Sequence, residues 1–242
     1  MLCMVCAVTS MSVLPACGDG SASAPTFTRD IAPIIYENCA ACHRPGESGP
    51  FPLLTYDDVY AHATQVADVT RSGFMPPWLP EHGSEKFADA RTLSDEQIAT
   101  IAAWVEAGAP RGDADDLPPL PEFTDGWELG PPDMVVRTPT YTLSPDGPDV
   151  YRNFVVRIPV DAPRYVRTVE FQPGNPRAIH HAGMAVDRTG AARRLDAQDD
   201  EPGFDGIAAQ IEGADTFDGL FLPWNPGAPA CPGYDGVAWR VD

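Results

Sequence analysis

Hydrophobic residues follow a helical period in the first half of the chain. Apolar side chains recur three and four positions apart in three stretches, as on one face of an amphipathic helix. These positions are Phe27, Ile31, Ile34 and Ile35, then Val59, Ala63, Val66 and Ala67, and finally Ile98, Ile101, Ala102 and Val105. The pattern predicts three helices within residues 26–112, with Pro33 early enough in the first helix to be tolerated.

Capping residues mark the expected ends of two of these helices. Thr55 with Asp58, and Ser94 with Gln97, place a hydroxyl side chain three residues before an acid or amide, which is the pattern of a capping box. Glycines stand where each of these helices is expected to end, and they are Gly73 and Gly108. We therefore expect an all-α domain at 26–112.

The second half of the chain has a different pattern of apolar and polar residues. Its short apolar runs partly alternate with polar residues and are separated by Pro, Gly and Asp, which favour turns. The runs lie at residues 134–136, 151–160, 165–171 and 184–186. This pattern predicts an antiparallel, jelly-roll-like β-sandwich at 126–242. Residues 113–125 are acidic, proline-rich and aperiodic, so we expect a linker there and an α+β chain of two domains.

The N-terminal residues have the composition of an export signal. Residues 1–17 are small and apolar, and a flexible tether follows at 18–25. The ending Leu-Pro-Ala-Cys resembles the lipobox of bacterial lipoproteins, which implies a lipid on Cys17. An ordinary cleaved signal is the alternative. Either interpretation exports the protein, so we expect a periplasmic or membrane-anchored bacterial lipoprotein that meets the membrane only through Cys17.

The charge and the cysteine content of the chain limit its binding partners and its disulfides. The chain carries 16 Lys and Arg against 35 Asp and Glu, a formal charge of −19. Because such a chain repels phosphate backbones, we expect no nucleic-acid partner. Once the leader is removed, Cys231 is separate from the other cysteines, so the sequence predicts no internal disulfide framework and leaves the partner of Cys231 open.

Cys39-Ala40-Ala41-Cys42-His43 forms the C-x-x-C-H pattern of covalent haem attachment. Two thiols three positions apart can each add to a vinyl group of one porphyrin, and the next residue then offers its imidazole to the iron. A zinc site would need two more ligands at similar spacing, which are missing. A thioredoxin-like motif would continue into a long helix, but Arg-Pro-Gly follows at once. The sequence therefore favours haem c held by Cys39, Cys42 and His43.

The sixth iron ligand has three candidates, Met75, His62 and His82. Met75 lies between the second and third predicted helices, and the prolines after it would hold an extended loop. Methionine raises the potential of haem iron, which suits electron transfer, so we favour Met75. Residues 26–112 resemble a cytochrome c domain, whose layout is a helix, the C-x-x-C-H motif, a loop and a final helix, here bearing Trp104. The resemblance implies one-electron exchange with a redox partner protein or a small reductant.

A histidine pair, His180-His181, lies among the predicted strands. Here the sequence resembles the N-terminal domain of copper type II, ascorbate-dependent monooxygenases, in which a His-His pair gives two of three imidazole ligands to one copper. The resemblance implies copper at His180 and His181. Adjacent strand residues point to opposite faces, so both rings reach one metal only where the strand is distorted.

The resemblance to the monooxygenases covers only part of that family. This chain has no histidine after His181, so the third ligand and the second copper site are missing, and we expect a C-terminally truncated copy. The main interpretation is an exported c-type haem electron-transfer protein whose haem domain serves the copper domain. Full-length relatives would hydroxylate a small organic substrate with oxygen, whereas enzyme activity of this chain alone is left open. The alternative is an electron-transfer cytochrome whose β domain binds a partner or carbohydrate without catalysis.

Overall fold

The structure is a computed structural model that describes residues 23–78, 87, 90–206, 222–228, 230–233 and 235–241. The leader at 1–17, Cys17 and His82 lie outside the described residues. No helix of the described residues is both long and apolar enough to cross a membrane.

The helical domain begins with η1 (Phe27–Ile31), a π-helical turn that continues into α1 (Ala32–Asn38). Pro33 stands in the first turn of α1, where a missing N–H leaves no hydrogen bond unmade. The first predicted helix is thus confirmed, and it ends at the C-x-x-C-H motif.

The second predicted helix is divided in two. It forms α2 (Tyr56–Ala61) and α3 (Ala63–Arg71), because His62 between them leaves helical geometry at φ −116° and ψ 13°. The capping box of Thr55 and Asp58 is present, with hydrogen bonds of 3.0 and 3.1 Å. Gly73 follows α3 at φ 69°, a conformation that favours glycine.

The third predicted helix is α4 (Asp95–Glu106), and its capping box of Ser94 and Gln97 is also present. Helix α4 packs against α3 and η1. The predicted apolar face points inward, since Ile101 is buried and Ile98, Ala102 and Val105 are half-buried. Trp104, which is not counted in that face, is also buried. The largest fully buried side chains among the described residues are Phe27, Ile31, Ile35, Val59, Ile101 and Trp104.

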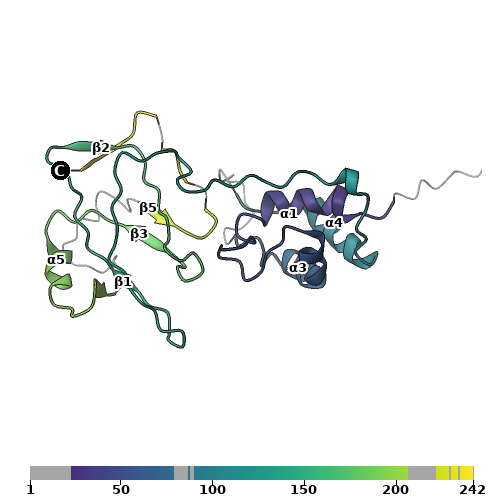
Figure 1. Cartoon of the computed structure of the whole chain (residues 1–242), viewed down its shortest axis with the longest axis horizontal. Helices are drawn as coiled ribbons and strands as arrows, with labels where there is room; N and C mark the ends of the chain where they lie inside the picture. Colours follow the sequence, from purple (N-terminus) through teal and green to yellow (C-terminus); the bar gives the residue numbers. More distant parts are fainter. Residues whose placement is uncertain are drawn as a thin grey trace, which may run out of the picture.

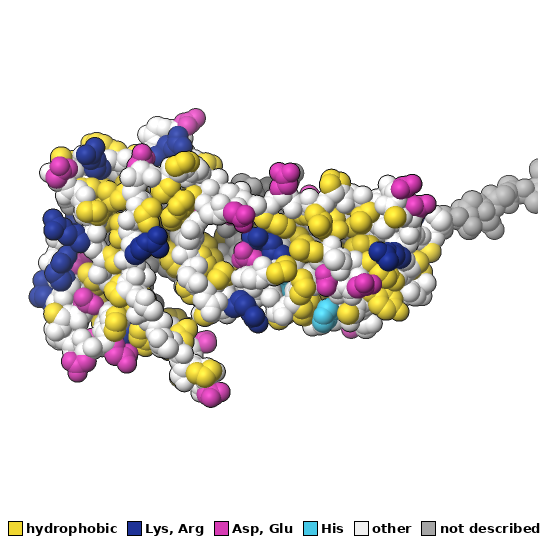
Figure 2. Space-filling view, in the orientation of Figure 1, with side chains coloured by type: hydrophobic (Ala, Val, Ile, Leu, Met, Phe, Trp, Pro, Cys, Tyr) yellow, Lys and Arg dark blue, Asp and Glu magenta, His cyan; other side chains and the backbone are white. Residues whose placement is uncertain are grey.

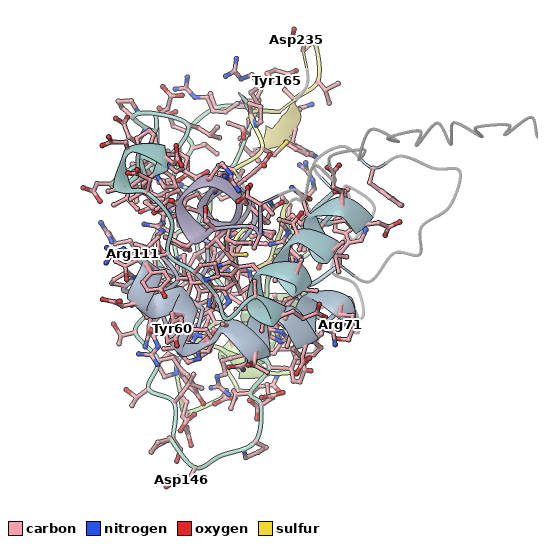
Figure 3. All side chains as sticks on the ribbon, turned by 90° about the vertical axis from the view of Figure 1, so that its right-hand side faces the viewer. Tyr60, Arg71, Arg111, Asp146, Tyr165 and Asp235 are labelled. Atoms are coloured by element: carbon pink, nitrogen blue, oxygen red, sulfur yellow. The ribbon has the colours of Figure 1, made fainter. Side chains whose placement is uncertain are left out.

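The two ends of the helical domain are joined by backbone hydrogen bonds. Phe27 N donates to the Pro110 carbonyl at 2.9 Å, and Thr28 N donates to the Arg111 carbonyl at 3.0 Å. Trp104 Nε1 also donates to the Pro110 carbonyl, at 2.9 Å. Arg111 lies at the edge of this domain beside η2 (Ala114–Asp116), as Figure 3 shows.

The predicted linker runs back along the helical domain. After η2 the chain is irregular, and it passes over the helices toward the strands (Figure 1). The guanidinium of Arg44, just after the C-x-x-C-H motif, lies 4.1 Å from the centre of the Phe123 ring. The linker is therefore in contact with the residue that follows the motif, although its sequence has no period.

The described residues of the second half form three separate two-stranded antiparallel ladders. They pair β1 (Arg152–Asn153) with β4 (Phe204–Asp205), β2 (Arg164–Val166) with β6 (Trp239–Val241), and β3 (Ala182–Met184) with β5 (Leu222–Trp224). One short helix, α5 (Ala191–Asp196), follows β3. Strands and antiparallel pairing agree with the α+β class.

The predicted sandwich or jelly roll is not confirmed. The strands are two or three residues long, and the apolar run at 134–136 is 41–44% exposed instead of facing a second sheet. Figure 2 shows hydrophobic side chains over the surface of this strand-bearing part. Short ladders without a shared buried face cannot build the two-layer core of a sandwich.

Arg152 fastens the β1–β4 ladder. Its side chain is only 6% exposed and makes hydrogen bonds of 2.9–3.0 Å with the carboxylates of Asp199 and Asp205. The guanidinium also lies 5.3 Å from the Tyr141 ring. Segments more than 45 residues apart in the sequence are thus joined at one polar centre.

Candidate haem-attachment site and histidine pair

The C-x-x-C-H motif forms a tight turn at the end of α1. Cys39 N donates to the Ile35 carbonyl at 2.8 Å, which completes the last turn of the helix. Cys42 N and His43 N then both donate to the Cys39 carbonyl, at 3.2 and 2.9 Å. One carbonyl therefore organises all three functional residues, so two thiols and one imidazole project from a single short loop.

Both motif cysteines are free thiols. Cys39 packs against the hydrophobic core, and this burial, with a smaller contribution from nearby Cys42, raises the pKa of its thiol to about 12. A thiol with such a pKa keeps its proton at neutral pH. Cys231 is also free and is exposed.

His43 is oriented by a backbone carbonyl. Its Nδ1 lies 3.0 Å from the Phe51 oxygen, and Leu53 N donates to the His43 carbonyl at 2.8 Å. In the tautomer with the proton on Nδ1, the ring donates to Phe51 and keeps the lone pair of Nε2 for a metal. This arrangement, with two thiols on the same turn, fits the donor set that haem c requires.

The loop at Gly49 lies close to the His43 side chain. Gly49 N donates to the Cys42 carbonyl at 2.9 Å, and a Cβ at Gly49 would lie 3.0 Å from Cγ of His43. Neither Gly49 nor Phe51 belongs to a site that the sequence predicts. The Gly49-Pro50 dipeptide was an available signal for the turn, whereas nothing in the sequence marks the Phe51 carbonyl.

His62, one of the candidates for the sixth ligand, packs on Phe51. The two rings are stacked 3.7 Å apart at 7°, and the His43 and Phe51 rings lie 5.2 Å apart. His62 Nδ1 is also 3.3 Å from Gln65 Oε1. His62 therefore stacks on Phe51, the same residue whose carbonyl lies beside Nδ1 of His43. This contact favours a packing role for His62 over iron ligation.

Met75 lies in the turn that follows α3. Its N–H donates to the Val69 carbonyl at 3.0 Å, and the residue is half-buried. The turn places Met75 between α3 and α4, as the sequence indicates. Its role as sixth ligand stays a prediction.

The rings of His180 and His181 lie side by side, just before β3. Their centres are 4.2 Å apart at an angle of 69°, and both residues are exposed. The pair therefore precedes the regular strand, where side chains would alternate between faces. Among the described residues no group of three His, Cys, Asp or Glu side chains could hold a metal ion. Two imidazoles alone bind copper weakly, so the pair lacks the third ligand that a closed site needs.

Comparison with known proteins supports the first domain. Residues 27–105 match the family model for cytochrome C oxidase, cbb3-type, subunit III. The match spans η1 to α4 and includes the C-x-x-C-H motif, so the chain contains a cytochrome c domain, and the family implies covalently bound haem c. Neither a curated protein nor a solved structure matches the chain. The matched residues include none of the histidine pair, and likeness to a monooxygenase is not shown.

Proposed function

We propose that this chain is an exported c-type cytochrome that passes single electrons between redox partners. The observation that carries the proposal is the C-x-x-C-H turn, with Nδ1 of His43 held by the Phe51 carbonyl, inside a domain that matches a cytochrome family model. Haem c, when bound, supplies a one-electron couple. The partner would be a redox protein or a small reductant.

Each residue of the turn has its own role in this proposal. Cys39 and Cys42 would each hold the porphyrin through one thioether, and His43 would bind the iron through Nε2. Met75 would be a further ligand of the iron, and a thioether ligand raises the potential of haem iron. Fixing Nδ1 on a carbonyl prevents rotation of the imidazole, so the ligand is oriented before the cofactor arrives.

Export belongs to the same proposal. The apolar leader at 1–17 ends at Cys17, which would be the lipid-bearing residue of the mature protein. Haem attachment of the c type takes place outside the cytoplasm, so the leader and the C-x-x-C-H motif support each other. Labelling with a radioactive fatty acid in a bacterial host, in wild type and Cys17→Ser, tests the anchor.

Haem attachment is tested by producing the full chain together with a c-type maturation system. We expect one haem per chain that stays bound on denaturation. Cys42→Ala should leave a single thioether, which shifts the α band of the pyridine haemochrome, and His43→Ala should abolish the low-spin spectrum. Cys231→Ala is the matched control, because this exposed thiol lies outside the motif. Wild-type chain without covalent haem would contradict the proposal.

A second candidate function adds copper at His180 and His181, with the haem domain as electron donor to a monooxygenase-like domain. The observation in its favour is the pair of exposed rings 4.2 Å apart. Copper per haem is measured in wild type and in His180→Ala/His181→Ala, with His62→Ala as the control. Copper lost only in the double variant supports this function. Copper absent from wild type supports a second domain that binds a partner or carbohydrate instead.

A further inference from the structure

A turn of the second domain reaches the haem-attachment motif. It follows β5 at residues 225–228, and Ala228 N donates to the Asn225 carbonyl at 3.0 Å. Pro226 and Gly227 occupy the two central positions, and Gly227 has φ +69°. Proline followed by a glycine of positive φ is the signature of a type II turn, so the local sequence dictates this shape.

The contact with Cys42 requires glycine. A Cβ added to Gly227 would overlap Sγ of Cys42 and would lie 3.2 Å from a guanidinium nitrogen of Arg91. Any side chain at this position would therefore displace the turn or the sulfur. Gly227 thus lets the backbone of the second domain approach the thiol within van der Waals contact.

Arg91 holds the turn in this position. Its guanidinium donates to the Pro226 carbonyl at 3.2 Å, across 135 residues of sequence. In a type II turn the central peptide directs its carbonyl away from the turn, which exposes it to an external donor. Arg91 comes from the segment before α4, so the hydrogen bond joins the cytochrome domain directly to the second domain.

The far side of the turn is also anchored. Ala230 N donates to the carboxylate of Glu128 at 3.0 Å. The backbone N–H groups of Glu128 and Leu129 in turn donate to the Glu170 carboxylate, at 3.0 and 3.1 Å. The turn is thus connected by hydrogen bonds to the chain just after the linker and to residue 170, which fixes its place within the second domain.

The histidine pair lies at the same end of its ladder as the turn. Ala182, the first residue of β3, pairs with Trp224, the last residue of β5. His180-His181 directly precede the first, and residues 225–228 directly follow the second, so both segments leave the ladder on one side. Figure 1 shows β3 and β5 next to each other on the side of the second domain that faces the helices.

We infer that the turn at 225–228 docks on Cys42 and Arg91 and shields the Cys42 end of the haem site from solvent. Whatever is bonded to Sγ of Cys42 then has the Pro226–Gly227 peptide beside it in place of water. The inference rests on the proposed haem attachment and names the occupant of this surface, the second domain of the same chain. Small oxidants in solution would reach the haem more slowly while the turn is docked.

The first test uses the haem-loaded full chain and ferricyanide, which accepts one electron from each ferrous haem. Stopped-flow absorbance compares wild type, Gly227→Ala and Gly236→Ala. Gly236 is the matched control, since its φ of +76° strains alanine equally but no atom lies within 4 Å of its Cβ position. We expect several-fold faster oxidation in Gly227→Ala alone, and a smaller increase in Arg91→Ala. Equal rates in Gly227→Ala and Gly236→Ala overturn the inference.

The second test works without haem and so separates this inference from the proposed function. In the apo chain with Cys231→Ser, iodoacetamide labelling of Cys42 is followed by mass spectrometry at about pH 8.5. We expect Cys42 to react several-fold faster in Gly227→Ala than in Gly236→Ala or in the chain with both glycines. Equal labelling overturns the docked turn even where haem attaches. Chain that never binds haem, but shows the difference in labelling, overturns only the proposed function.

Discussion

Gly49→Ala is the sharpest single test of the haem-attachment loop. Gly49 has no positive φ, so alanine suits its backbone, and only the surrounding space opposes the substitution. The added Cβ would lie 2.7 Å from the Cys42 carbonyl oxygen and 3.0 Å from both Cα and Cγ of His43. Two of these contacts are with backbone atoms, so no rotamer change relieves them.

The cost of this substitution follows from those distances. Overpacking of a close-packed site costs about 1–3 kcal/mol. Withdrawal of the loop would lose the 2.9 Å hydrogen bond from Gly49 N to the Cys42 carbonyl, about 1 kcal/mol. The sum is about 2–4 kcal/mol. At about 4–8 °C per kcal/mol for a domain of this size, the melting temperature should fall by at least about 8 °C.

Thermal unfolding by circular dichroism measures this loss, and the absorption spectrum of the haem-loaded chain reports the position of His43. We expect Gly49→Ala to unfold earlier and to gain high-spin features, because the imidazole is pushed from its place. Gly46→Ala is the control in the same loop, with a strained φ of +89° but no atom within 4 Å of the added Cβ. It should lose some stability and keep the spectrum. Gly49→Ala with wild-type melting and spectrum would refute the reasoning.

Three further predictions concern packing and ionisation. Trp104→Phe removes the indole N–H that donates to the Pro110 carbonyl at 2.9 Å. Thermal unfolding should therefore show a loss of about 2 kcal/mol in the free energy of unfolding. An unchanged melting temperature would contradict this packing. Burial raises the pKa of Cys39 to about 12, so alkylation of the apo chain at about pH 9 should leave Cys39 unmodified, and labelling as fast as that of an exposed thiol would disprove its burial. Hydrogen bonds from Arg152 lower the pKa of Asp199 in the folded protein. The stabilisation from this ion pair is therefore full at a pH above the ordinary pKa of an aspartate, and it is lost as the pH falls through the lowered pKa of Asp199. The difference in urea stability between wild type and Asp199→Asn should therefore shrink between neutral pH and about pH 2, and a pH-independent difference would contradict this ion pair.

The helical domain could be predicted because its signals are local. Ser94 and Gln97 cap α4 within four residues of each other, and the C-x-x-C-H spacing lies within one turn. The break at His62 was missed, since the apolar period runs through it unchanged. At the break the His62 ring stacks on Phe51, which lies in the loop before the helix, and no local pattern marks this contact.

The second domain was harder to predict because its pairing is long-range. Alternation indicates a strand near residue 165, yet the partner of β2 is β6, more than 70 residues later. No local sequence pattern identifies that partner strand. Local patterns also do not show whether the ladders share a buried face. The polar centre at Arg152 and the approach of Gly227 to Cys42 depend on the same long-range pairing, so the sequence alone did not indicate either.

The hydrogen bonds from Phe27 and Thr28 to Pro110 and Arg111 have a consequence for the history of this chain. They close the cytochrome domain on itself, so its first and last residues lie side by side. A unit of this kind can be spliced into a loop of another protein, or joined to a new neighbour, without spreading its ends apart. The same closure permits circular permutation, with new ends opened in an exposed loop. The helical domain could therefore be fused to a different neighbour without separating its own ends.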